Sequence, residues 1–358
     1  MNKTRICICG GGNLGHVTAG HLASRGDLDV RLMTRHPEKF TDRILLIETP
    51  DGGVEEGLLN IVTDSPEEAI RDADIVLLCL PGFAIAKELG DMAPFLSKET
   101  VVGSIFCSSG FFPMAEKILP EGTPLFGFQR VPYIARIQEY GHKAHLMGFR
   151  PECHIATLGI EGRSGFRELI ENIFGVHINL LDSHLEATLT NSNPLLHPSR
   201  MFALFEGHES YDHIPLFYED WDNRSSETYI ACDNEFQKVR EALGIPQEAI
   251  PTALEHYESH DAESMTRKIT SIPSLKGIPV PMLKATDGSF IPDYSNRCFT
   301  EDIPFGMLIT KSYAIRLGIE TPAIDRIILW AQGRMGKEYL TGGILTGKDI
   351  GESVAKYI

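Results

Sequence analysis

The sequence predicts an α/β domain built on a parallel sheet, followed by a helical domain. Short apolar runs alternate with helical patterns through the first half of the chain, which is typical of parallel strands covered by helices on both faces. The chain has 358 residues, more than one ordinary core holds. Near residue 183, long helical patterns replace the strand signals. We therefore expect two domains, 1–183 and 184–358, the second all-α.

The expected strands of the first domain are short and apolar. They are 4–9, 29–34, 59–63, 73–80, 100–106, 125–129, 144–149, 153–159 and 177–181. Helical spacing follows the first strand and recurs at 65–73, where Ser65 and Pro66 are a favourable helix start, and again at 164–174. The DGG turn at 51–53 predicts a hairpin inserted before the third strand.

Charge and cysteine usage exclude several classes of protein. The formal net charge of −16 opposes binding to nucleic acid or to anionic membranes. The longest apolar runs fall short of the ~20 residues that span a bilayer, so a cytoplasmic protein is expected. The seven cysteines are an odd number and spread widely, and Cys7, Cys9 and Cys79 lie in apolar runs, which fits a reducing compartment. Cys7 and Cys9 have no matching Cys/His pair nearby, so no metal site is expected.

A glycine motif lies between the first predicted strand and the first predicted helix. Gly10, Gly12 and Gly15 form G-x-G-x-x-G, which provides a tight turn, room for a pyrophosphate and close packing of helix on strand. The amides at the start of the helix attract phosphate. The first domain is therefore expected to be a Rossmann-type, doubly wound sheet that binds a dinucleotide. The expected cofactor contacts also include Asn13, Leu14, Leu80 and Pro81.

The end of the second strand bears on the choice of dinucleotide. An acid there usually binds the ribose hydroxyl of NAD, whereas a cation binds the 2′-phosphate of NADP. Here the chain offers Thr34 and Arg35 and no acid. An arginine can hold a phosphate by two parallel hydrogen bonds. This favours NADP over NAD, with a solvated Arg35 or one stacked on adenine as the alternative.

Two segments of the second domain concentrate polar groups beside apolar ones, NSNPLLHPSRMF at 191–202 and YSNRCFTEDIPFG at 294–306. A nicotinamide reductase needs a proton donor beside the carbon that accepts hydride, and a cation for a substrate carboxylate. Histidine suits the first role and arginine the second. A carboxylate paired with the imidazole would fix its tautomer. Spacing alone does not show that His197 and Asp302 meet.

These segments, with GGGNLGH at 10–16 and GIETPAIDRIILWAQ at 318–332, resemble the opine dehydrogenases, the octopine and nopaline dehydrogenase group. The resemblance implies a dinucleotide domain joined to a helical domain, and reductive condensation of an amino acid with a 2-oxo acid. It implies His197 as acid/base with Asp302 as its partner, although Glu301 adjoins Asp302. It also implies Arg297 as carboxylate ligand, with Gln129 and Asn193 near the substrate.

Other functions remain open from the sequence. A reductase of a single 2-oxo acid, similar to ketopantoate reductase, would use a lysine in the helical domain, and Lys238 lies in a helical pattern. A redox-sensing protein would keep the dinucleotide fold and lack catalysis, and the intact His, Arg and Asp set argues against it. The helical domain could also serve dimerisation, so a homodimer is a further hypothesis. For the amino acid, the acidic YEDWD at 218–222 would suit a guanidinium substrate and SRMFALF at 199–205 an apolar one.

Overall fold

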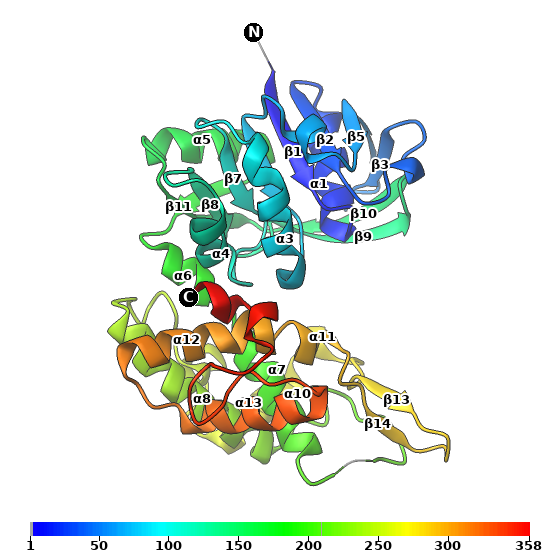
Figure 1. Ribbon diagram of the computed structural model, residues 1–358. Helices are drawn as coiled ribbons and strands as arrows, with labels where there is room; N and C mark the ends of the chain where they lie inside the picture. The colour runs from blue at the N-terminus through cyan, green and yellow to red at the C-terminus, as the bar shows by residue number, and fades with distance from the viewer. Residues whose placement is uncertain (1–2, 209) are drawn as a thin grey trace. The chain divides into compact units, whose positions relative to one another are not determined.

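The computed structural model describes residues 3–208 and 210–358. The chain divides into two compact units, Met1–Thr188 and Leu189–Ile358 (Figure 1). The first unit is an α/β domain on a mostly parallel sheet and the second is mainly helical, as the sequence predicts. Among the described residues, no helix combines the length and apolar character that crossing a membrane requires.

The large sheet of the first unit has eight strands in the order β12-β11-β8-β7-β6-β1-β2-β5. The six strands from β5 to β8 run parallel, and β11 pairs antiparallel to β8. The strands are β1 Thr4–Cys9, β2 Leu28–Met33, β5 Ile61–Thr63, β6 Ile75–Leu78, β7 Val101–Ser104, β8 Leu125–Phe128, β11 Glu152–Leu158 and β12 His177–Leu180.

Helices cover both faces of this sheet. They are α1 Asn13–Ser24, α2 Pro66–Ile70, α3 Gly82–Met92, α4 Phe111–Ile118 and α5 Arg163–Phe174, with short turns η1 Pro37–Lys39 and η2 Ala93–Phe95. Helix α6 (His184–Leu189) follows β12 at the boundary of the two units. Side chains of α1 and α5 share one core with alternate residues of the strands, while α3 contacts both α2 and α4. Both alternating sets in β1 and β6 are buried, which explains their continuous apolar sequence.

The predicted hairpin before β5 is confirmed, but it belongs to a second sheet. Strands β3 (Ile44–Glu48) and β4 (Val54–Leu58) join β9 (Tyr133–Glu139) and β10 (Lys143–Phe149) in the order β4-β3-β10-β9. This sheet contacts α1, and a Cβ at Gly57 would overlap the Gly20 carbonyl. The sequence analysis expected only a local excursion of the first sheet, because pairing between β3 and β10 joins segments about 100 residues apart.

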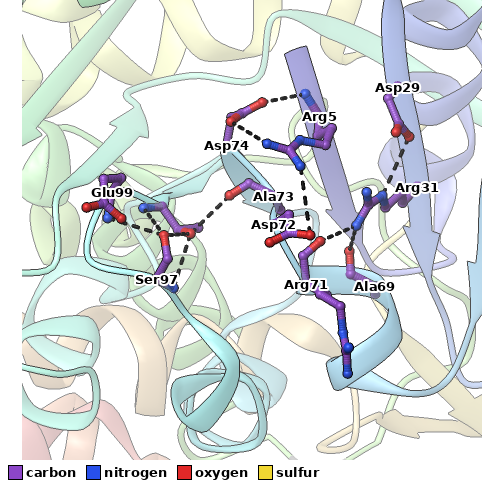
Figure 2. A network of polar contacts seen from close by, with 11 residues as sticks. Arg5, Asp29, Arg31, Ala69, Arg71, Asp72, Ala73, Asp74, Ser97 and Glu99 are labelled. Carbon is purple, nitrogen blue, oxygen red and sulfur yellow. Dashed lines mark hydrogen bonds and ion pairs between the residues drawn. The ribbon is translucent and has the colours of Figure 1, made fainter. Parts of the chain in front are cut away.

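A polar network fastens the amino-terminal ends of β1 and β6 (Figure 2). Asp74 accepts the Arg5 amide at 2.8 Å and also pairs with its guanidinium group. Arg31, nearly buried in β2, donates to the carbonyl oxygens of Ala69 and Arg71 at the end of α2. The Arg5–Asp74 contacts thus lie at the amino-terminal end of β1, whereas the glycine loop follows its carboxyl end.

The second unit is organised around the long helix α8 (Asn223–Ala242), which packs on α7, α10, α12 and α13. Two acids of α8 cap other helices: Asp233 accepts the Ala253 amide, and Glu235 accepts the amides of Ala323 and Ile324. Burial raises the pKa of both carboxyl groups. The other helices are α7 Asn193–Phe205, α9 Ala253–His256, α10 Ala262–Ser271, α11 Arg297–Thr300, α12 Leu308–Leu317 and α13 Pro322–Met335.

The helical unit also carries shorter elements that the sequence analysis did not anticipate. A hairpin of β13 (Met282–Lys284) and β14 (Phe290–Pro292) extends away from the helices of this unit (Figure 1). A π-helical turn, η4 (Ile303–Met307), directly precedes α12. The remaining short turns are η3 Pro273–Leu275, η5 Ile350–Glu352 and η6 Val354–Tyr357.

Candidate functional site

The glycine loop joins β1 to α1 in the way its sequence predicts. Gly10 has φ of +121°, and a Cβ there would lie 2.6 Å from the Cys79 carbonyl oxygen, so this position requires glycine. A Cβ at Gly15 would overlap the Gly10 carbonyl oxygen, which shows how closely α1 packs on the loop. Gly12, by contrast, has open space where a Cβ would stand. The loop therefore leaves room for a ligand beside the N-terminus of α1, whose first turn contains no acid.

A cavity of about 790 Å³ lies next to this loop. Its walls include six of the predicted cofactor residues, namely Gly10, Gly12, Thr34, Arg35, Leu80 and Pro81. Asn13, Leu14 and Gly15 lie outside the set of lining residues. The Asn13 side chain accepts the Ile137 amide at 2.8 Å, and Leu14 packs against the core. The volume lies in the range of small-molecule sites.

The hairpin of β9 and β10 also contributes to this cavity, which the sequence analysis missed. Tyr140, at its turn, lines the cavity with its hydroxyl 3.4 Å from Thr34 Oγ1. His16 fastens this turn: its Nε2 accepts the Gly141 amide at 2.9 Å, and its Nδ1 lies 3.1 Å from the Gly12 carbonyl oxygen. This geometry requires the neutral ring, and burial lowers the pKa of His16. Only the long-range strand pairing reveals this contribution.

The cavity carries charges of both signs. Arg35 and Lys87 line it together with Asp64, Glu88 and Asp91. Lys87 is paired with Asp91 one turn along α3. Burial, and then the Asp91 carboxylate, raise the pKa of Glu88, while the charges of Lys87 and Arg35 act in the opposite direction. The acids escaped the sequence analysis because Asp64 follows β5, and Glu88 and Asp91 lie on α3, rather than at the end of β2.

In the helical unit, the structure brings His197 and Asp302 together. His197 Nδ1 lies 2.8 Å from Asp302 Oδ2, although the two residues are 105 positions apart. The carboxyl group of Asp302 is buried and the imidazole is mostly buried. A carboxylate accepts the Nδ1 proton, which leaves Nε2 as the basic nitrogen of the neutral ring. The geometry thus distinguishes Asp302 from its neighbour Glu301 as the partner of His197.

Irregular helices place these two side chains. His197 lies in α7 between Pro194, in the first turn, and Pro198, which removes one backbone donor from the helix. Asp302 directly precedes the π-helical turn η4. A Cβ at Gly306 would lie 2.5 Å from the Pro194 ring, so glycine allows η4 to approach α7 closely. Irregular helical turns of this kind are frequent at functional sites.

Two further side chains adjoin the His–Asp pair. The Tyr218 hydroxyl lies 3.2 Å from His197 Nε2. Cys298 Sγ forms a compact group with His197 and Asp302, in which one potential ligand atom from each lies within 4.8 Å of the others. Burial, and then the Asp302 charge, raise the pKa of Cys298 to about 12, so this thiol is protonated near neutral pH. A protonated thiol is a poor metal ligand.

The predicted substrate residues occupy three different places. Asn193 lies in α7 one turn before His197, on the same face of the helix. Arg297 begins α11, where its carbonyl oxygen accepts the Asp302 amide and its side chain is exposed. Gln129 follows β8 in the first unit, where its amide donates to the His154 carbonyl oxygen. The sequence hypothesis thus draws on both units.

Both segments considered for the amino acid's side chain have structural contacts. In YEDWD, Asp222 caps α8, Asp220 accepts the Leu216 amide and Glu219 accepts the Gly277 amide. In SRMFALF, the side chains of Met201, Phe202 and Phe205 are buried. Lys238, the lysine of the rival reductase hypothesis, is exposed on α8. These segments contribute to the packing of the helical unit.

Known proteins resemble this chain along nearly its whole length. The family model for the NAD/NADP octopine/nopaline dehydrogenase α-helical domain matches residues 180–335, and that for the ketopantoate reductase PanE/ApbA matches residues 6–122. Octopine dehydrogenase of Pecten maximus is 30% identical, over 97% of this chain and 94% of the relative. The chain belongs to the opine dehydrogenase family.

Other members of the opine dehydrogenase family extend this likeness. Tauropine dehydrogenase of Arabella iricolor is 29% identical over 96% of this chain and 95% of its own. A solved structure of octopine dehydrogenase with NADH and L-arginine superposes with a TM-score of 0.89 at 30% identity, covering 99% of this chain and 95% of that one. Both units therefore have counterparts among opine dehydrogenases.

Proposed function

We propose that this protein is an NAD(P)H-dependent opine dehydrogenase, which joins an amino acid to a 2-oxo acid and reduces the resulting imine. The observation that carries the proposal is the hydrogen bond between His197 and Asp302 in a helical unit of the opine dehydrogenase family. Octopine dehydrogenase structures with NADH and with L-arginine or pyruvate support this class of substrates. Gly12 and the N-terminus of α1 would hold the dinucleotide, which would supply the hydride when bound.

In this reaction His197 is the acid/base and Asp302 is its partner. Asp302 holds the Nδ1 proton and stabilises the imidazolium that forms when Nε2 takes up a proton. Nε2 accepts a proton from the amine as it attacks the carbonyl carbon, and the resulting alkoxide takes one proton from solvent to give the carbinolamine. The imidazolium then returns its proton as water leaves, which gives the protonated imine. Asn193 lies on the same helix face as His197 and is proposed to contact the substrate. Gln129, in the first unit, is proposed as a further substrate residue.

Arg297 is proposed to bind a substrate carboxylate. Arg297 is the first residue of the short helix α11, and its side chain is exposed. Its guanidinium group can bind a carboxylate by two parallel hydrogen bonds, and Asp302 follows five residues later in the chain. We expect Arg297→Ala to raise the KM for the 2-oxo acid at least tenfold with an unchanged Kd for NADH. An increased Kd for NADH with an unchanged KM would instead assign Arg297 to the cofactor.

For the cofactor, we propose that both dinucleotides bind and that NADPH is preferred. Arg35 and His36 line the cavity beside Thr34, where a 2′-phosphate would meet them, whereas Glu88 opposes a second negative charge. Arg35→Ala is expected to lower kcat/KM for NADPH about tenfold and to leave that for NADH nearly unchanged. A wild-type enzyme that prefers NADH would contradict the assignment of Arg35.

The decisive experiment follows dinucleotide oxidation by the purified protein. NADH and NADPH are supplied separately with pyruvate or 2-oxoglutarate, each with and without a pool of amino acids. Oxidation that requires both an oxo acid and an amino acid would support opine synthesis. Oxidation with the oxo acid alone would favour a 2-oxo acid reductase, and dinucleotide binding without turnover would favour a sensor.

The proposed cellular setting and assembly need separate tests. We propose a cytoplasmic enzyme, because the buried free cysteines suit a reducing compartment. A homodimer is the proposed assembly. Sedimentation of the purified protein would distinguish a particle of about twice the chain mass of 39.7 kDa from a monomer.

A further inference from the structure

His197 is hydrogen-bonded through both ring nitrogens. Asp302 lies 2.8 Å from Nδ1 and the Tyr218 hydroxyl lies 3.2 Å from Nε2. With the Nδ1 proton directed to Asp302, Nε2 of the neutral ring accepts the phenolic proton, and Nε2 of the imidazolium donates to the phenolic oxygen. Tyr218 therefore contacts the nitrogen that exchanges protons in the proposed reaction, in either charge state of the ring.

The segment that carries Tyr218 is firmly held. Arg200, one turn after His197 in α7, is 1% exposed and donates to the carbonyl oxygens of Phe217 and Asp220, on both sides of Tyr218. The guanidinium group also lies 5.6 Å from the centre of the Trp221 ring. A buried arginine stays charged, and its desolvation costs free energy unless its donors are hydrogen-bonded. The two carbonyl oxygens that accept from Arg200 therefore hold the backbone on both sides of Tyr218 in place.

Aromatic packing fixes the direction of the Tyr218 ring. Its plane lies within 8° of that of Trp221, whose indole nitrogen donates to Ser226 at 2.9 Å. The edge of Phe217 meets the His197 ring at 87°, with 5.4 Å between ring centres. Tyr218 as a whole is only partly buried. Burial also raises the pKa of Tyr218, which disfavours a free phenolate.

We propose that Tyr218 is a further catalytic residue, which relays the proton between His197 and the substrate oxygen. The inference rests on the proposed function, in which His197 is the acid. As the carbinolamine loses water, the Tyr218 hydroxyl gives its proton to the departing oxygen and takes one from the imidazolium Nε2. The C–O bond breaks with its electron pair going to water, the nitrogen lone pair forms the C=N bond, and His197 becomes neutral. Both protons move together, so no phenolate accumulates.

The test compares Tyr218→Phe with Tyr211→Phe. Tyr211 is a matched control, because its hydroxyl donates to the Leu204 carbonyl oxygen in the same unit, away from His197. With NADH, pyruvate and the amino acid that supports turnover, we expect Tyr218→Phe to lower kcat at least about tenfold, with the Kd for NADH unchanged. Tyr211→Phe should retain kcat within about twofold.

Mixtures of H₂O and D₂O provide a readout that a purely structural role would not change. Transfer of two protons in one step predicts a curved dependence of kcat on deuterium fraction for the wild type, and a single-proton, linear dependence for Tyr218→Phe. An unchanged or higher kcat in Tyr218→Phe would overturn the relay and show that the hydroxyl only occupies the place of the substrate. An equal loss in Tyr211→Phe would also overturn it.

Failure of the proposed function would be recognised separately. If the wild type reduces pyruvate without an amino acid, opine synthesis is wrong, while the two variants still test the relay, because the carbonyl oxygen also needs a proton. If the wild type binds NADH and oxidises none with any substrate pair, both the proposed function and the relay are overturned.

Discussion

At the scale of single residues, the pairing of His197 with one of two adjacent acids leads to a sharp prediction. Asp302→Asn should lower kcat by about 10²-fold or more, because an amide neither fixes the Nδ1 proton nor stabilises the imidazolium. Steady-state kinetics and NADH fluorescence would measure kcat and cofactor affinity. Glu301→Gln is the matched control, since it removes one negative charge at the neighbouring position. Equal losses in both variants would refute the pairing.

His16 makes a second prediction, which concerns pH. Burial lowers its pKa in the folded protein below the ordinary value of about 6.5, so the unfolded chain binds a proton more readily. The stabilisation is present above pH 6.5 and is lost as the pH falls towards the lower, folded pKa. We expect the free energy of unfolding in urea to decrease more between pH 7.5 and 5.5 for the wild type than for His16→Gln. Parallel decreases would show that other groups dominate.

Residues also show where sequence reasoning ends. The His197–Asp302 pair could be predicted because both lie in segments resembling those of a known family. Tyr218 and Tyr140 could not, since each reaches its partner through tertiary packing; Tyr218 begins YEDWD, a segment considered only for its acids. The three acids of YEDWD looked available for a substrate, but each has a backbone amide to accept. Short polar segments give no signal that separates capping from binding.

At the scale of elements, glycines in the turn from β1 to α1 have two different roles. Gly12 leaves space for a ligand, and Gly15 allows α1 to pack closely on the loop. We expect Gly12→Ala to fold normally, because a Cβ there meets open space, and to raise the Kd for NADH at least about tenfold by occupying the place of the pyrophosphate. Gly15→Ala should destabilise the fold by about 3 kcal/mol or more, because its Cβ would overlap the Gly10 carbonyl oxygen. Urea unfolding and NADH titration would measure both effects. Equal free energies of unfolding in the two variants, with weak NADH binding in both, would contradict this assignment of roles.

The elements themselves were largely predictable, because continuous apolar strands and helical spacing are local signals. Strand β1 begins and ends at the predicted residues, and the predicted hairpin of β3 and β4 forms. Its membership of a second sheet was not predictable, because β3 pairs with β10 through contacts that no local pattern encodes. The short strands β13 and β14 were missed for a related reason, since three residues are too few to show periodicity.

At the scale of the whole molecule, the distribution of thiols gives a prediction that covers both units. All seven cysteines are free and buried. Burial raises the pKa of Cys153 to about 11, and that of Cys79 and Cys232 to about 12. Because the thiolate is the reactive form, iodoacetamide at pH 8 should modify the native protein at least about 100-fold more slowly than the protein in urea. Mass spectrometry would count the adducts, and rapid labelling of one site would identify a unit that opens locally.

The hairpin of β9 and β10 contacts the first turn of α1, so amide exchange in the hairpin should report whether a dinucleotide is bound. The amides of Ile137 and Gly141 donate to side chains of Asn13 and His16, which belong to the first turn of α1. A ligand that orders this turn would slow hydrogen–deuterium exchange at these two amides, in a different sheet and more than 120 positions along the chain. Their exchange rates would therefore follow dinucleotide binding in the absence of any second substrate. They would distinguish protein that holds a dinucleotide without turnover from protein that holds none.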